Sequence, residues 1–133
     1  MSELIPLDVA MTHLYAEEAD KEQVARKLAG AVAIAERYMG RKIYANFSQL
    51  QDAQAAATLE RKNLSQDDDE LYQSQLSDLQ MQMRGVVISP DIETAILLIL
   101  GTLYAYREDV AVGVAELPTS AKFYLQSYRV MEV

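Results

Sequence analysis

The sequence predicts an all-α protein, a small helical bundle around one buried central helix. Two features of the composition favour this class: only 5 Gly and 3 Pro leave little room for the frequent turns of an all-β fold, and helix-favouring residues are abundant. The third observation is a segment that is apolar on every side. From Ala95 to Tyr106 almost every residue is apolar, which is typical of a helix at the centre of a core.

The central helix is expected over about residues 90–108. Ser89 can cap its start, and Pro90 suits the first turn, where a backbone N–H has no helical partner to lose. Asp91 and Glu93 place negative charge at the positive end of the helix dipole. A membrane span would need about 20 apolar residues, and this run is shorter and has charges at both ends. We therefore expect a helix buried in a protein core.

The residues expected to form the core lie on the central helix and on the longer helix that precedes it. On the central helix they are Ile96, Leu100, Leu103 and Tyr104. The residues expected to pack on them are Leu28, Val32 and Ala35. These positions follow helical spacing, so each set lies along one face of its helix.

Two helices are expected before residue 40. Pro6–Tyr15 has the apolar spacing of a short helix, and the polar stretch 16–20 ends it. Asp20 with Gln23 resembles a capping box at the start of a second, longer helix, and Gly40 suits the left-handed residue after its end. The apolar stripe of this second helix consists of Val24, Leu28, Ala31, Val32, Ala35, Tyr38 and Met39.

Residues 46–84 are expected to form a helical insertion between the second and the central helix. The segment is rich in Gln and poor in bulky apolar residues. We expect helices over Gln49–Arg61 and Gln66–Met83, joined near residues 62–65. Each is preceded by residues that resemble a capping box, Ser48 with Gln51 and Ser65 with Asp68. Their narrow apolar stripes suit a helical hairpin or a contact with another subunit, and low-complexity disorder is the alternative.

The remaining segments connect these helices within a single domain, residues 1–133. Residues 42–47 fit either a strand-like connector or a loop, and Val86 with Val87 suits a brief extended piece. After the central helix we expect a loop over 110–116. A last helix then starts at Leu117-Pro118, with one face made of Ala121, Tyr124, Leu125 and Tyr128.

Charge and cysteine content exclude several functional classes. The formal net charge of −8 argues against non-specific nucleic-acid binding, which depends on Lys and Arg at phosphates. The absence of Cys removes disulfides, thiolate nucleophiles and Cys-ligated zinc. The start MSELIPLDV has no basic segment followed by a long apolar one, so we expect no secretory signal and a cytoplasmic location.

Catalytic and metal-binding groups are scarce. His13 is the single His, and only Glu17 shares its helix face, so a structural or solvent-facing role is favoured over catalysis. The acidic run Asp67–Glu70 lacks the alternating ligands and the Gly of a calcium loop and suits a solvated helix start. No Gly-rich phosphate loop or nucleophile motif is present. We therefore expect no enzyme activity, no catalytic residues, no cofactor and no metal.

A helix-turn-helix would place its turn at residues 16–20. The helix that follows carries Lys21, Arg26 and Lys27, but acidic residues offset these cations and the whole chain is acidic. Recognition helices are usually basic and belong to basic domains. Sequence-specific DNA binding is therefore the weaker alternative.

Candidate interface residues lie at the ends of the last two helices: Tyr104, Tyr106, Arg107, Tyr128 and Arg129. Tyr and Arg are enriched at protein interfaces. The alternative is that the tyrosines, Tyr124 included, are core-edge residues whose hydroxyls reach water.

The ordered set of segments resembles the small head–tail connector (adaptor) proteins of tailed bacteriophages. The matching pieces are Leu14 with the acidic break after it, Ala35–Arg41, Ile92–Glu108 with its Tyr-x-x-Arg-Glu ending, Leu117-Pro118 and Tyr128-Arg129. They cover most of the chain outside 46–84. Each string is common by itself, and the weight lies in their order and spacing.

This resemblance implies a non-enzymatic, mostly helical structural protein that forms a ring of roughly a dozen subunits. The implied partners are the portal protein, a head-completion or tail protein, and DNA that passes through the channel without sequence-specific binding. No membrane is implied. The implied location is the head–tail junction of the virion, after assembly in the bacterial host cytoplasm. The longer helical insertion departs from the family, and its role stays open: it lines the channel, lies between subunits or faces outward.

Two other functions remain open at this point. One is a small cytoplasmic helical regulator that acts through protein contacts or a helix-turn-helix. The other is a different structural component of a phage, such as a tail-completion protein.

Overall fold

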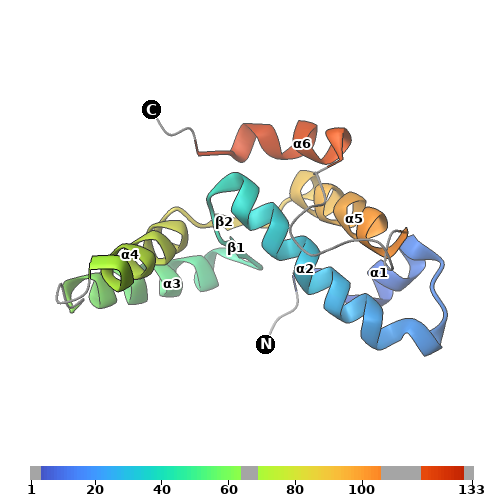
Figure 1. Ribbon diagram of the computed structural model, residues 1–133, viewed down its shortest axis with the longest axis horizontal. Coiled ribbons are helices and arrows are strands. Elements are labelled where there is room, and N and C mark those ends of the chain that lie inside the picture. Colours follow the sequence, from blue (N-terminus) through green and yellow to red (C-terminus); the bar gives the residue numbers. More distant parts are fainter. Residues whose placement is uncertain (1–3, 64–68, 106–117, 131–133) are drawn as a thin grey trace.

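The computed structural model describes residues 4–63, 69–105 and 118–130. These residues form six α-helices, two single-turn 3-10 helices (η1 and η2) and a two-stranded sheet, which confirms the all-α class. In chain order the elements are α1 (Leu7–Leu14), η1 (Glu18–Asp20), α2 (Lys21–Met39), β1 (Ile43–Tyr44), α3 (Phe47–Lys62), α4 (Asp69–Met83), β2 (Val86–Val87), α5 (Pro90–Ala105), α6 (Thr119–Leu125) and η2 (Gln126–Tyr128). Helices α1, α2, α5 and α6 form a bundle, and α3 with α4 forms a separate hairpin (Figure 1). None of the helices in the described ranges is long and apolar enough to cross a bilayer.

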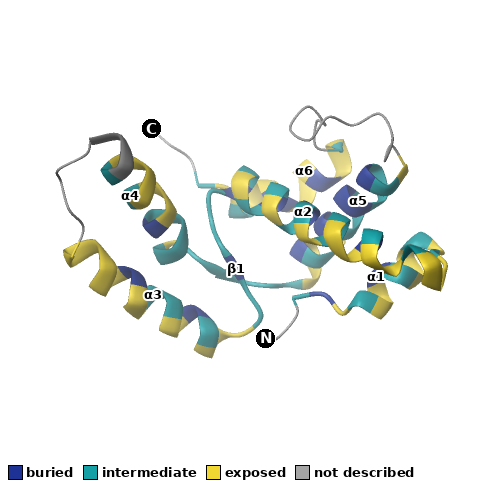
Figure 2. Cartoon of the chain, turned by 60° about the horizontal axis from the view of Figure 1, so that its bottom comes forward, coloured by how far each residue is buried: buried dark blue, intermediate teal, exposed yellow. Residues whose placement is uncertain are grey.

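Helix α5 lies at the centre of the bundle, where α2 and α6 pack along it and α1 covers its remaining side. The buried residues gather between these helices (Figure 2). On α5 they are Ile92, Ala95, Ile96, Ile99, Leu100 and Leu103. The predicted central helix is thereby confirmed as far as Ala105, and residues 106–108 lie outside the described ranges.

The predicted packing partners of α5 lie on α2 as expected. Ala35 is fully buried there, whereas Leu28 and Val32 are half-buried against the core. The fully buried residues of α2 are Val24, Ala31, Ala35 and Met39, which share the stripe read from the sequence. Tyr104 is half-buried rather than central, because its hydroxyl reaches a polar partner at the core edge.

Two helix ends confirm their sequence signals. The Ser89 hydroxyl accepts the Ile92 backbone N–H at 3.4 Å, and Pro90 is the first residue of α5. Gly40 adopts a left-handed conformation with φ +71° after α2, and its N–H donates to the Glu36 carbonyl at 2.9 Å. Glycine adopts this conformation without the steric cost that a Cβ atom brings.

Two capping predictions were wrong. Asp20 directly precedes α2, but its side chain makes no capping hydrogen bond and accepts one from Tyr104 instead. Helix α3 begins at Phe47 rather than Gln49, because the Asn46 carboxamide oxygen accepts the Gln49 N–H at 2.9 Å. Ser48 therefore lies inside the first turn and does not cap the helix. The proposed cap at Ser65 lies outside the described residues.

Replacing Asn46 with alanine is expected to lower the free energy of unfolding by about 0.5–2 kcal/mol, because the Gln49 N–H loses its side-chain acceptor. Ser48→Ala is the matched control, since alanine favours the helix interior and no cap is lost. Urea denaturation measures both changes. An equal or larger loss in the Ser48 variant would contradict the assignment of the cap to Asn46.

The α3–α4 hairpin is held together by glutamine side chains as well as by apolar contacts. Gln54 Nε2 donates to the Met83 carbonyl at 2.9 Å, and Gln82 Nε2 donates to the Ala53 carbonyl at 2.7 Å. The buried apolar residues described in the hairpin are Leu50, Ala57 and Leu79, and none of them belongs to the core of the bundle. The Gln-rich insertion is thus an ordered helical hairpin over its described part, outside the main core.

A short parallel sheet joins the hairpin to the bundle. The segment 42–47 thus contains the strand β1 (Ile43–Tyr44), and its last residue, Phe47, begins α3. Ile43 pairs with Val86 and Tyr44 with Val87. Burial raises the pKa of the Tyr44 phenol, and the neighbouring Glu36 carboxylate raises it further. We call this two-stranded junction the neck of the hairpin.

Gly85 allows the neck to close. A Cβ atom at this position would lie 2.5 Å from Tyr44 Cε2 and 2.7 Å from Leu50 Cδ1, well inside van der Waals contact. Gly85→Ala is therefore expected to cost about 1–3 kcal/mol in the free energy of unfolding, as overpacking does.

The control is Gly30→Ala in α2, where an added Cβ meets only Leu103 Cδ1 at 3.9 Å. This change is expected to stabilise the protein by about 0.5–1 kcal/mol, because alanine favours a helix more than glycine does. Thermal unfolding of both variants measures the two effects. Equal shifts of the unfolding temperature in the same direction would show that the close contacts at Gly85 do not determine the effect of the substitution on stability.

Candidate functional site

The structure does not bring together the three predicted interface residues that it describes, Tyr104, Tyr128 and Arg129. Helices α5 and α6 run antiparallel, so Tyr104 lies at one end of α5 while Tyr128 and Arg129 lie beside the other end (Figure 1). The two ends are about 20 Å apart along the helix axis. Tyr106 and Arg107 lie outside the described residues. The described tyrosines thus belong to two separate places.

Tyr104 closes one end of the bundle. Its hydroxyl donates to Asp20 Oδ2 at 3.0 Å, which ties the end of α5 to the start of α2. This contact satisfies a half-buried phenol at the core edge, as the alternative interpretation of the tyrosines expects.

Tyr128 and Arg129 are engaged within the chain at the opposite end. The Tyr128 hydroxyl lies 3.2 Å from Ser89 Oγ and 3.4 Å from Asp91 Oδ2, at the start of α5. The Arg129 guanidinium lies over the Tyr38 ring, 4.8 Å from its centroid, which is a cation–π distance. Both side chains fasten the C-terminal segment to the bundle.

Arg41 joins three segments at this end of the molecule. Its Nε donates to the Tyr128 carbonyl at 2.7 Å, and its Nη1 donates to the Arg84 carbonyl at 2.8 Å. Beside it, the Val130 N–H donates to the Met39 carbonyl at 2.8 Å. The side chain therefore links the end of α2 to the C-terminal segment and to the end of the hairpin.

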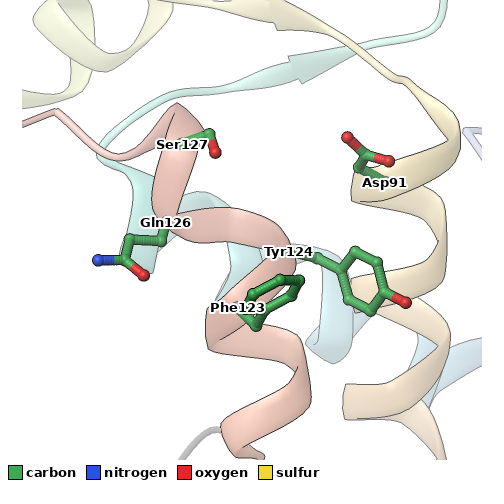
Figure 3. Close-up of a pocket in the computed structure, with 5 residues that line it drawn as sticks. All are labelled: Asp91, Phe123, Tyr124, Gln126 and Ser127. Atoms are coloured by element: carbon green, nitrogen blue, oxygen red, sulfur yellow. The ribbon is translucent and has the colours of Figure 1, made fainter.

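An aromatic pair lies exposed next to this junction. The rings of Phe123 and Tyr124 meet edge to face, with centroids 5.7 Å apart and planes at 82°. Phe123 is 74% exposed, an unusual position for a large apolar side chain. The pair borders a shallow pocket of about 510 Å³ between α6 and the start of α5, whose other lining residues are Asp91, Gln126 and Ser127 (Figure 3). We call this the aromatic pocket.

The sequence contains a signal for this exposed aromatic surface that the predicted set of interface residues does not include. Ala121 and Leu125 are the buried residues of α6, four positions apart on one face. Phe123 lies midway between them, about 200° around the helix, so it must point away from the core. An aromatic residue opposite the buried face is a better indicator of an interface than the hydroxyl-bearing tyrosines at the helix ends.

No three His, Asp or Glu side chains among the described residues are placed to hold a metal ion together. His13 is exposed on α1. Of the acidic run, Asp69 and Glu70 begin α4, while residues 67 and 68 lie outside the described ranges. The exposed aromatic pocket and the hairpin outside the core are the two features that suggest contacts with other molecules.

Comparison of the chain with protein-family models, with curated proteins and with solved structures finds no match.

Proposed function

We propose that this chain is a head–tail connector of a tailed bacteriophage or prophage. In this role it forms a ring of roughly a dozen subunits between the portal and a head-completion or tail protein and extends the DNA channel. It acts as a structural protein at the head–tail junction of the virion and is assembled in the host cytoplasm. The proposal starts from the ordered segments of the sequence that resemble this family.

The structural observation that best supports the proposal is the hairpin outside the core. Few side chains are buried among the described residues of the hairpin. Such a helix pair gains little stability by itself, since most helical stability comes from packing an apolar face. Its projection from the bundle makes it available to a neighbouring molecule (Figure 2). A ring needs such a protruding element, because one surface of each subunit must meet a different surface of the next.

The charge of the chain is compatible with a DNA channel. A formal net charge of −8 disfavours condensation on phosphates, so a duplex could pass an acidic wall without being retained. Within the described residues, one ion pair is present, between Lys21 and the exposed Glu18 at 3.6 Å. An acidic surface suits transient passage of DNA better than sequence-specific binding, because it does not attract the phosphates.

The mass of the purified protein across a range of concentrations tests the proposal, by native mass spectrometry or light scattering. A discrete ring of roughly a dozen chains is the expected result. A stable dimer at every concentration would instead favour a small helical regulator. If the protein is a monomer, the portal protein from the same genome is added, and failure to assemble on the portal contradicts the connector proposal.

A further inference from the structure

We propose that the last turns of α3 in one subunit dock on the aromatic pocket of a second copy of this chain. Leu59 would cover the exposed aromatic pair, and the Lys62 ammonium would pair with the Asp91 carboxylate. This inference rests on the self-assembly proposed above and names the two surfaces that meet.

The pocket selects an apolar group that is followed by a cation. Phe123 offers an exposed ring, Tyr124 forms the wall beside it, and Asp91 supplies a carboxylate on the other side of the pocket (Figure 3). Within the described residues, Asp91 has a hydroxyl neighbour, Tyr128, but no cation within ion-pair distance. A ligand with a short alkyl group and an ammonium several ångströms away would satisfy both parts of the site.

Helix α3 carries that combination on its outer face. Ala55, Leu59 and Lys62 follow one another at spacings of four and three residues, so they form one stripe, and all three are exposed. Leu59 is 63% exposed, although leucine is usually buried. Lys62 has no ion-pair partner among the described residues. Among the described residues, nothing covers the apolar surface of the stripe or pairs with its positive charge.

The two surfaces belong to different parts of the molecule. The stripe belongs to the last turns of α3, whereas the pocket is lined by residues of α5, α6 and η2. Figure 1 shows α3 in the hairpin and α5 and α6 in the bundle. About 24 Å of helix separates the two ends of α3, and the neck holds its first turn at the bundle. The stripe of one copy must therefore meet the pocket of another, a head-to-tail contact that can close into a ring.

Charge reversal tests the contact. Lys62→Glu and Asp91→Lys are each expected to weaken self-association by roughly 10- to 100-fold, because like charges then face each other. Combining both substitutions in one chain restores the opposite charges, so association is expected to return to near the wild-type value. Sedimentation or native mass spectrometry over a concentration series measures all three.

Each reversal has a matched control. For Lys62→Glu the control is Arg61→Glu, which makes the same charge change one residue away, on another side of α3. For Asp91→Lys the control is Asp8→Lys, because Asp8 lies in the first turn of α1 as Asp91 lies in the first turn of α5. Neither control is expected to change association by more than about twofold, the effect of net charge alone. Phe123→Ser, at an exposed position, is expected to weaken association while the circular dichroism spectrum stays unchanged.

The outcomes separate this inference from the proposed function. If the wild type forms a ring and both single variants assemble equally well, the docking is wrong and the ring stands. If the double variant fails to recover although it is folded, the pairing of Lys62 with Asp91 is wrong. A wild-type chain that stays monomeric at about 1 mM also overturns the docking, whereas assembly on the portal would still support a connector.

Discussion

Replacing Leu100 with alanine is expected to lower the free energy of unfolding by about 2–5 kcal/mol. Leu100 is fully buried on α5, the helix against which the other bundle helices pack. The substitution removes its apolar contacts and leaves a cavity that neighbouring side chains on two packed helices fill only in part. For a domain of this size, such a loss is a large fraction of the total stability.

The matched control is Leu59→Ala, the same chemical change at a side chain that is 63% exposed. Its expected effect lies within about 0.5 kcal/mol when unfolding is followed at low protein concentration, where subunits are separate. Urea denaturation with an unchanged m-value compares the two variants. A cost below about 1 kcal/mol for Leu100→Ala would show that α5 is not the centre of the core.

The fold was predictable where one physical effect dominates. The run from Ala95 onward is apolar on all sides, so only a central position could satisfy it, and its burial followed directly. The stripe of α2 and the left-handed Gly40 were predictable for the same reason, because periodicity and positive φ leave few alternatives.

The capping errors arose where a second interaction or a second residue competes for the start of the helix. Asp20 has the chemistry of an N-cap, but a tertiary hydrogen bond from Tyr104, 84 positions away, takes its carboxylate instead. At α3, both Asn46 and Ser48 have side chains that can cap a helix. The sequence does not show which of the two the preceding strand places at the N-cap position. Long-range contacts decide such cases, and they are invisible to local spacing.

The candidate surfaces were predictable only in part. The narrow stripes of the insertion indicated a hairpin or a subunit contact, and the hairpin is confirmed. The sequence places Tyr104 and Tyr128 near the ends of their helices, but the antiparallel course of α5 and α6 keeps those two ends apart. Helix polarity is a property of the tertiary fold. Phe123 could have been found by asking which large side chain faces away from the buried pair on α6.

The role of Arg41 could not be read from the sequence, where it follows Gly40 near the negative end of α2. In the structure its guanidinium extends to two carbonyl groups from elsewhere in the chain, those of Tyr128 and Arg84. Arg84 directly follows α4, and the carbonyl groups at the C-terminal end of a helix have no partners within the helix. Arg41 supplies a positive charge and a hydrogen-bond donor at this end of α4. One side chain thereby sets the position of both the hairpin and the C-terminal segment.

Arg41→Ala is therefore expected to lower the free energy of unfolding by about 2–4 kcal/mol, because two charge-assisted hydrogen bonds are lost together. Amide hydrogen exchange gives a local measure of the same change. The Val130 N–H, bonded to the Met39 carbonyl at 2.8 Å, should exchange faster once the C-terminal segment is released. Lysine at position 41 should recover little, because its single ammonium lacks the planar fork that reaches two carbonyls.

Arg37→Ala provides the control, because it is the same substitution at an exposed arginine one turn earlier, on α2. Its expected effect lies within about 0.5 kcal/mol, with protection at Val130 unchanged. If the two arginine variants behave alike, the destabilisation comes from lost positive charge at the end of α2. If Arg41→Ala alone accelerates exchange at Val130, the two hydrogen bonds hold the C-terminal segment in place, and through it the start of α5 that borders the aromatic pocket.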